Sequence, residues 1–129
     1  MPTIAGIDHL ALTVSDLDAS VNFYTALWGA APAATMDDGP FLRRIFALPG
    51  GTTLGLTQHD HGSGRLFDAA TPGLDHVGFR VAWRSDLLAW AQHLDEHQIR
   101  HSGVVDAPYG AALSFTDPDG VALEFFLPA

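Results

Sequence analysis

The chain has 129 residues, 47% of them hydrophobic and 16% charged, which is typical of a globular protein and not of a disordered one. Its formal charge of −9 argues against nucleic acid as a partner, because binding phosphates requires clustered lysine and arginine. It has no cysteine, which excludes disulfides and thiolate chemistry. No apolar run reaches the ~20 residues of a membrane span, and no basic-then-apolar leader opens the chain. We therefore expect a cytoplasmic protein with no membrane partner.

Two segments of the chain share one pattern of alternating apolar residues, Ile7–Val14 and Leu74–Val81. Each segment has a histidine directly after an aspartate, and these histidines, His9 and His76, are 67 positions apart. Because this offset is close to half the chain length, the sequence predicts two copies of one unit. We expect a single domain over residues 1–129, with module one at about 1–60 and module two at about 73–129.

The first module is predicted to contain one helix among four strands. The strand from Ile4 to Val14 alternates in the way that a half-buried strand does. A helix follows, with Ser15 as its expected N-cap and Gly29 as the glycine that ends it. The remaining strands are expected at residues 30–36, 41–48 and 52–58, the first of them at a sheet edge because of Pro32.

The second module repeats this order after a linker over residues 59–72, which is rich in Gly, Asp and Thr. A strand over residues 74–82 leads to a helix with Ser85 as its expected N-cap. Further strands are predicted at residues 99–105, 111–116 and 121–127. The Asp-Gly pair that ends at Gly120 favours a tight turn between the last two strands.

These patterns predict an α+β fold of two βαβββ modules, with one helix on one face of each mixed sheet. A sheet face that lacks a helix needs another cover, and the economical cover is the sheet of the partner module. We therefore expect a cup-shaped, partly open barrel with the helices outside. Strand alternation places His9, His76 and Glu124 on the faces away from the helices, and so inside this cup.

The chain resembles the vicinal oxygen chelate superfamily, also called the glyoxalase / bleomycin-resistance / dioxygenase family. The resemblance implies paired βαβββ modules, a homodimer, and a divalent ion (Fe, Ni, Zn, Mn or Co) in the cup. It covers essentially the whole chain. The motifs that carry it are Ile7–His9, Val14–Leu17, Phe23-Tyr24, Leu27–Gly29, Leu74–Val77, Phe115–Gly120 and Leu123–Phe126.

By this resemblance the metal ligands are His9, His76 and Glu124. The fourth ligand of four-ligand members falls on Gly55, which has no side chain, and this argues against the four-ligand chemistries. Two histidines and one glutamate have the composition of a facial triad that leaves coordination positions open for substrate, water or dioxygen. The extradiol dioxygenase pattern would also place a tyrosine at Ser114.

Other side chains are weaker candidates for the site. Arg80 shares a strand face with His76, and it or Arg44 could bind a substrate carboxylate or phosphate. A surface ion pair is the alternative for each of them. Tyr109 could form an aromatic wall or supply an acid at the mouth of the cup, and packing is its alternative. Glu124, Tyr109 and Arg80 are therefore the predicted catalytic residues.

Other histidines lie outside this set: one pair with the spacing of a metal site, and a group in the linker that we interpret as a solvated loop. His93 and His97 have the H-x-x-E-H spacing of some zinc peptidases, but we interpret them as part of a solvated helix face. His59, in the linker, could reach the mouth of the cup.

Three functions fit these residues. The first is a small metal-dependent enzyme, a lyase, isomerase or dioxygenase, that acts on a small molecule with adjacent oxygens. The second is a metal-free protein that sequesters a drug, as bleomycin-resistance members do, and the acidic charge suits a cationic drug. The third is a purely structural metal site.

Overall fold

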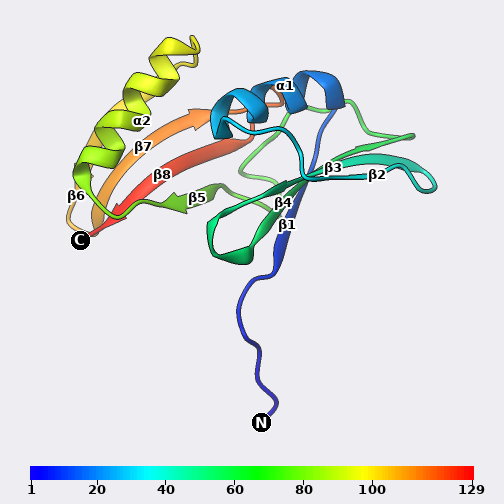
Figure 1. Ribbon diagram of the computed structural model, residues 1–129, viewed down its shortest axis with the longest axis horizontal. Helices are drawn as coiled ribbons and strands as arrows, with labels where there is room; N and C mark the ends of the chain where they lie inside the picture. The colour runs from blue at the N-terminus through cyan, green and yellow to red at the C-terminus, as the bar shows by residue number, and fades with distance from the viewer. The chain divides into compact units, whose positions relative to one another are not determined.

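The computed structural model describes all residues from 1 to 129. The chain forms two compact units, Met1–Arg65 and Leu66–Ala129. Each unit is one four-stranded mixed sheet with one helix packed on it, in the order β-α-β-β-β (Figure 1). This confirms the predicted βαβββ modules. Neither helix has the length and apolar character that crossing a membrane requires.

In the first unit the strand order is β1-β4-β3-β2, with β1 parallel to β4 and the other pairs antiparallel. The predicted edge strand is confirmed as β2, which pairs with β3 alone. A single 3-10 turn, η1 (Pro49–Gly51), links β3 to β4. The other elements are β1 (His9–Thr13), α1 (Leu17–Trp28), β2 (Ala34–Met36), β3 (Phe41–Ala47) and β4 (Thr53–His59).

The second unit has the equivalent order, β5-β8-β7-β6, with β5 parallel to β8. The Asp117 carboxylate accepts the amides of Asp119 and Val121, both at 2.9 Å, and Gly120 has a φ of 82°, which confirms the predicted turn before β8. The elements are β5 (Val77–Arg80), α2 (Arg84–Glu96), β6 (His101–Ala107), β7 (Gly110–Thr116) and β8 (Ala122–Pro128).

The core of the first unit lies between α1 and one face of its sheet. The helix begins at Leu17 because the Asp16 carboxylate accepts the Ala19 amide at 3.1 Å, so the expected cap at Ser15 is wrong. It ends at Gly29, which has a φ of 68°, as predicted. Tyr24 of the helix is fully buried, with its ring 6.3 Å from that of Phe46 on β3.

The core of the second unit lies between α2 and the equivalent face of its sheet. Trp90 stacks on Phe125 of β8, with ring centroids 4.1 Å apart, and Leu113 beneath the helix is fully buried. A leucine buried in this way stabilises a fold by about 1.5–3 kcal/mol. Ser85 is not the N-cap: the helix begins at Arg84, and the Asp86 carboxylate accepts the Trp83 amide at 3.0 Å.

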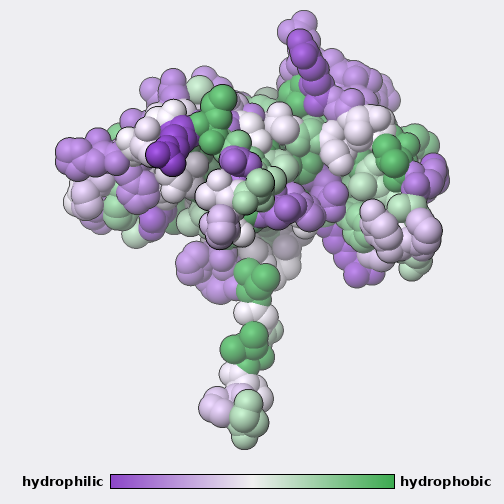
Figure 2. Space-filling view, turned by 180° about the vertical axis from the view of Figure 1, so that it is seen from behind, coloured by the Kyte–Doolittle hydropathy of each residue, from purple (hydrophilic) through white to green (hydrophobic).

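Both opening strands are shorter than predicted. Strand β1 begins at His9 because its partner β4 begins at Thr53, directly opposite. The preceding residues are extended and exposed, with Ile4 92% and Ile7 81% accessible, and this segment projects with apolar side chains along it (Figures 1 and 2). Strand β5 likewise begins at Val77, so that His76 lies directly before it.

Each sheet has a second face that its own helix does not cover, and we call it the helix-free face. On β4 the buried Leu54 and Leu56 alternate with Gly55 and Thr57, which therefore belong to the helix-free face. The same face of the first unit includes His9, Ala11, Arg43 and Ile45. In the second unit it includes Gly78, Arg80, Ala112, Ser114, Glu124 and Phe126.

One exposed ion pair provides a test of how α2 is joined to β6. Arg84 donates to the two carboxylate oxygens of Asp106 at 2.6 and 2.9 Å, and this hydrogen bonding lowers the pKa of Asp106 below its ordinary value. A carboxyl group whose pKa is lower in the folded state than in the unfolded state stabilises the fold at a pH above its unfolded-state pKa. This stabilisation is lost as the pH falls through the folded-state pKa.

We predict that Arg84→Gln returns the pKa of Asp106 towards its ordinary value, measured by NMR titration of the Asp106 carboxyl carbon. The free energy of unfolding should fall at neutral pH and match that of the wild type in acid. Arg100→Gln is the matched control, because Arg100 is exposed and has no ion pair. An unchanged Asp106 titration in Arg84→Gln would show that the pair does not form.

Candidate functional site

The second unit brings two of the predicted metal ligands together. The Nε2 atom of His76 lies 3.6 Å from Oε1 of Glu124, which projects from the helix-free face of β8. The other ring nitrogen of His76, Nδ1, donates to Oδ1 of Asp75 at 2.6 Å. In the neutral ring this bond places the Nε2 lone pair on the side of the glutamate, an arrangement that metal-binding histidines commonly use.

The charges around His76 favour its protonated form when no cation is present. The hydrogen bond to Asp75 raises the pKa of His76 above its ordinary value, and the negative charges of Glu124 and Asp75 add to this against the opposing effect of burial. Glu124 is partly shielded, with 23% of its side chain accessible, while half of the His76 side chain is accessible. The carboxylates around His76 thus attract positive charge, a proton or a metal ion, to a ring that solvent can reach.

A glycine makes room for this carboxylate. Gly78 pairs with Glu124 across β5 and β8, and a Cβ atom at Gly78 would lie 3.2 Å from the glutamate Oε1. That contact is tighter than side chains normally make, so an alanine would push the carboxylate away. The prediction from sequence missed this role of Gly78, although a glycine inside a strand often marks a close approach.

The first unit carries the same histidine arrangement. Nδ1 of His9 donates to Oδ2 of Asp8 at 2.7 Å, which again leaves Nε2 free, and two thirds of the His9 side chain is accessible. His9 lies on β1 opposite Thr53. In neither unit do three or more histidine, aspartate or glutamate side chains come together as a complete metal site.

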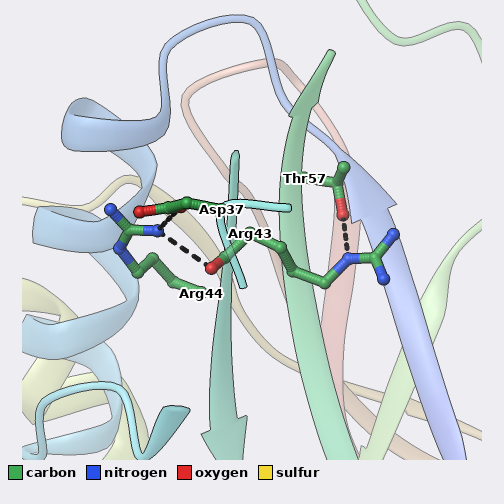
Figure 3. A network of polar contacts seen from close by, with 4 residues as sticks. All are labelled: Asp37, Arg43, Arg44 and Thr57. Atoms are coloured by element: carbon green, nitrogen blue, oxygen red, sulfur yellow. Dashed lines mark hydrogen bonds and ion pairs between the residues drawn. The ribbon is translucent and has the colours of Figure 1, made fainter. Parts of the chain in front are cut away.

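Gly55, which the resemblance places at the fourth-ligand position, lies on the helix-free face. Gly55 pairs with Ala11 and Ile45, which matches the pairing of Glu124 with Gly78 and Ser114 in the second unit. The cationic side chain beside it is one that the sequence prediction missed. Arg43 passes Gly55, and its Nε donates to Thr57 Oγ1 at 2.7 Å (Figure 3).

Of the two alternatives for Arg44, the structure shows the surface ion pair, and its side chain does not lie on the helix-free face. Arg44 projects from the other face of β3, the face of Phe46, and donates to Asp37 at 2.6 Å. Figure 3 shows Arg43 and Arg44 pointing in opposite directions from the strand. The reason is the period of two in a strand, which gives adjacent residues opposite faces.

Tyr109 and Arg80 lie at the border of the second unit's helix-free face. The exposed Tyr109 ring stacks near Phe126, with centroids 6.3 Å apart. Gly110 permits this, because a Cβ there would lie 2.7 Å from Cζ of Phe126 and would also meet the Leu127 carbonyl. Arg80 is exposed, two residues beyond Gly78 on the same strand face.

The other predicted histidines lie elsewhere. His93 and His97 are near the C-terminal end of α2, with ring centroids 4.5 Å apart and no third ligand beside them. This supports their interpretation as a helix surface and not as a catalytic zinc site. His59 ends β4, and its ring contacts the edge of Phe41 with centroids 6.2 Å apart.

Comparison with known proteins gives the family. Residues 6–125 match the Glyoxalase/Bleomycin resistance protein/Dioxygenase superfamily. The chain therefore belongs to this superfamily, as the motifs predicted. It resembles the crystal structure of a glyoxylase/bleomycin resistance protein/dioxygenase domain from Frankia sp. EAN1pec, with 33% identity and a TM-score of 0.90 over 98% of this chain and 100% of that one. The predicted fold class is thus confirmed.

More distant relatives have named activities. Metapyrocatechase of Geobacillus stearothermophilus is 25% identical over 95% of this chain. MhqA of Bacillus subtilis (strain 168), which carries the name of a ring-cleaving dioxygenase, is 26% identical over 93%. The chain spans only 35% and 39% of the lengths of these two curated relatives.

A fosfomycin resistance protein, FosX from Listeria monocytogenes, shares the fold. It is 16% identical with a TM-score of 0.70, over 96% of this chain and 93% of that one. That structure is of a point mutant of FosX, complexed with Mn(II) and 1S,2S-dihydroxypropylphosphonic acid.

We predict that Gly78→Ala displaces the Glu124 carboxylate, by a few tenths of an ångström or to another rotamer, in a crystal structure of the variant. Gly55→Ala is the matched control, because a Cβ there would make only ordinary contacts of 3.6 Å with Ala11 and 3.7 Å with Arg43. Gly55→Ala should stabilise the fold by about 0.4–1 kcal/mol, because alanine lowers the conformational entropy of the unfolded chain. Gly78→Ala should stabilise it by less, because the tight contact with Glu124 offsets this gain. An unmoved Glu124 in Gly78→Ala would contradict this account of the strand pair.

Proposed function

We propose that this protein is a small divalent-metal-dependent enzyme of the glyoxalase/dioxygenase type, which acts on a small molecule with adjacent oxygen atoms. His9, His76 and Glu124 are the proposed ligands of the metal, which is Fe, Ni, Zn, Mn or Co. The observation that carries the proposal is the 3.6 Å approach of the free His76 nitrogen to the Glu124 carboxylate. A small-molecule substrate and a homodimer are the proposed partners.

The donor chemistry of these residues fits a divalent first-row ion. Imidazole and carboxylate are ligands that such ions accept, and Asp75 holds His76 with Nε2 free to bind. Asp8 does the same for His9. The repetition supports a common role, because a surface histidine needs no such partner on its far nitrogen.

The relatives support a metal-dependent reaction on adjacent oxygens. MhqA carries the name of a ring-cleaving dioxygenase, and the FosX complex contains Mn(II) with a ligand that has two neighbouring hydroxyl groups. A bound metal would act as a Lewis acid that polarises substrate oxygens. Three protein ligands would leave positions for both oxygens of such a substrate.

The remaining side chains have proposed roles around the substrate. Glu124 acts as a metal ligand and, when it is not coordinated, as a base. Tyr109 stacks near Phe126 and offers an aromatic wall with an acidic hydroxyl. Arg80 binds a negative substrate group from the edge of the same face. Ser114 stands opposite Glu124 where the extradiol pattern has a tyrosine, which favours lyase or isomerase chemistry over extradiol ring cleavage.

We predict that tag-free protein binds about one metal ion per chain when Fe(II), Ni(II), Zn(II) or Mn(II) is offered, measured by elemental analysis after buffer exchange. His9→Ala, His76→Ala and Glu124→Ala should each lose this stoichiometry, because each removes one of only three protein ligands. EDTA should remove the metal and the activity together.

The control is the double variant His93→Ala with His97→Ala, since these imidazoles are close enough on α2 to bind an adventitious ion. It should retain the stoichiometric metal. Stoichiometric metal in His76→Ala would contradict the assignment. Failure of the wild type to take up any of the four metals would instead favour metal-free sequestration of a drug, which the acidic charge suits.

A further inference from the structure

Arg43 occupies an unusual position on the helix-free face of the first unit. Its side chain lies across β4, where Gly55 provides no side chain to block it (Figure 3). Its Nε donates to Oγ1 of Thr57, a residue that is only 2% accessible, so this bond anchors the guanidinium to a rigid part of the sheet. The same group lies over the ring of Phe41, 4.4 Å from its centroid. These contacts hold its orientation.

The outer half of this guanidinium has no partner. No aspartate or glutamate forms an ion pair with Arg43, and its two terminal nitrogens make no hydrogen bond within the chain. The exposed Arg65, Arg80 and Arg100 likewise form no ion pair, but of these four arginines only Arg43 has its guanidinium held by a hydrogen bond and an aromatic ring. Arg44 and Arg84, by comparison, are paired with Asp37 and Asp106. An arginine binds oxyanions through two parallel N–H donors. Arg43 has two such donors unused, on a guanidinium whose orientation is fixed.

The position of Arg43 also relates it to a proposed metal ligand. Ala11, whose side chain lies beside Gly55, is two residues from His9 on β1. Two residues along a strand correspond to about 7 Å, and both side chains lie on the same face. One small molecule could therefore reach both His9 and the Arg43 guanidinium.

The second unit has residues of different charge at the positions equivalent to Gly55 and Arg43. Glu124 stands where the first unit has Gly55, and Ala112, opposite Phe126, stands where it has Arg43. At these two positions the second unit has a carboxylate and the first unit has an arginine, and the second unit's only arginine on this face is the exposed Arg80 at its border. This difference supports a role for Arg43 in recognising a ligand, because packing alone would not require a charge in only one of two equivalent places.

We propose that Arg43 binds an oxyanion, a carboxylate or a phosphonate, on the small molecule that this protein takes. The two terminal nitrogens make the contact while Nε stays on Thr57. Calling this molecule the substrate rests on the proposed function, whereas the anion site itself does not. Arg43 is thus a residue that determines specificity for acidic ligands.

The test is an NMR titration of EDTA-treated protein with benzoate, methylphosphonate and the neutral analogue benzamide, following the Nε–H resonance of Arg43. We expect an anion to shift this resonance and benzamide to leave it in place. The tighter of the two anions identifies the carboxylate or the phosphonate as the natural group. Arg43→Gln should weaken anion binding about 10-fold or more, and Arg43→Lys should retain part of it, because lysine keeps the charge but not the fork.

Arg44→Gln is the matched control, since it removes a neighbouring arginine from the opposite face of the same strand. Its anion affinity should stay within about twofold of the wild type, because adjacent strand residues point to opposite faces and the Arg44 side chain is paired with Asp37. Thermal unfolding of each variant shows that the fold is intact. Equal anion binding by Arg43→Gln and the wild type, or no shift of the Arg43 resonance with either anion, would overturn the proposal.

The same titration in His76→Ala separates the two proposals. If the wild type takes up no metal and His76→Ala still binds anions, the metal-dependent function is overturned and the Arg43 site stands. Stoichiometric metal in a wild type that binds neither anion would overturn the Arg43 site alone.

Discussion

A single helix can cover only one face of a four-stranded sheet, and the rest of this structure depends on that constraint. In each unit the apolar side chains at alternate strand positions bury themselves under the one helix, as Phe46 does under α1 and Phe125 under α2. The intervening positions then face away from the helix. Every residue that we assign to chemistry lies on or beside this helix-free face, so the packing of the core decides which side chains are available for function.

The two units show how a repeat can retain a scaffold while its charges diverge. Both keep the Asp-His pair, with Nδ1 bonded to the preceding carboxylate at 2.7 Å in one unit and 2.6 Å in the other. Both keep the parallel pairing of the opening and closing strands. They differ at neighbouring positions on the helix-free faces, where Gly55 corresponds to Glu124 and Arg43 to Ala112. We propose that this difference gives the second unit the carboxylate of the metal site and the first unit an arginine for an oxyanion.

Much of the fold and of the candidate site could be predicted from the sequence, because the patterns that indicate them involve residues close together in the chain. The repeated Asp-His pair, the helix-ending glycine and the alternation around Glu124 each fix a position without knowledge of the partner strand. The arginines could not be assigned in this way. Residues 41–46 are apolar at both even and odd positions, so their alternation is ambiguous, and the contact of Phe46 with Tyr24 decides which arginine faces the helix. Gly78 was missed because its role depends on the register with Glu124.

The central claim is that His76 binds a metal through Nε2, because its hydrogen bond to Asp75 keeps a proton on Nδ1. The most direct measurement is a two-bond hydrogen–nitrogen NMR correlation of the His76 imidazole, recorded with and without zinc. The neutral ring should be the Nδ1–H tautomer, and its Nε2 resonance should move on addition of zinc to one equivalent, ahead of those of His93 and His97. An Nε2–H tautomer, or an Nε2 resonance that zinc leaves unchanged, would contradict the claim.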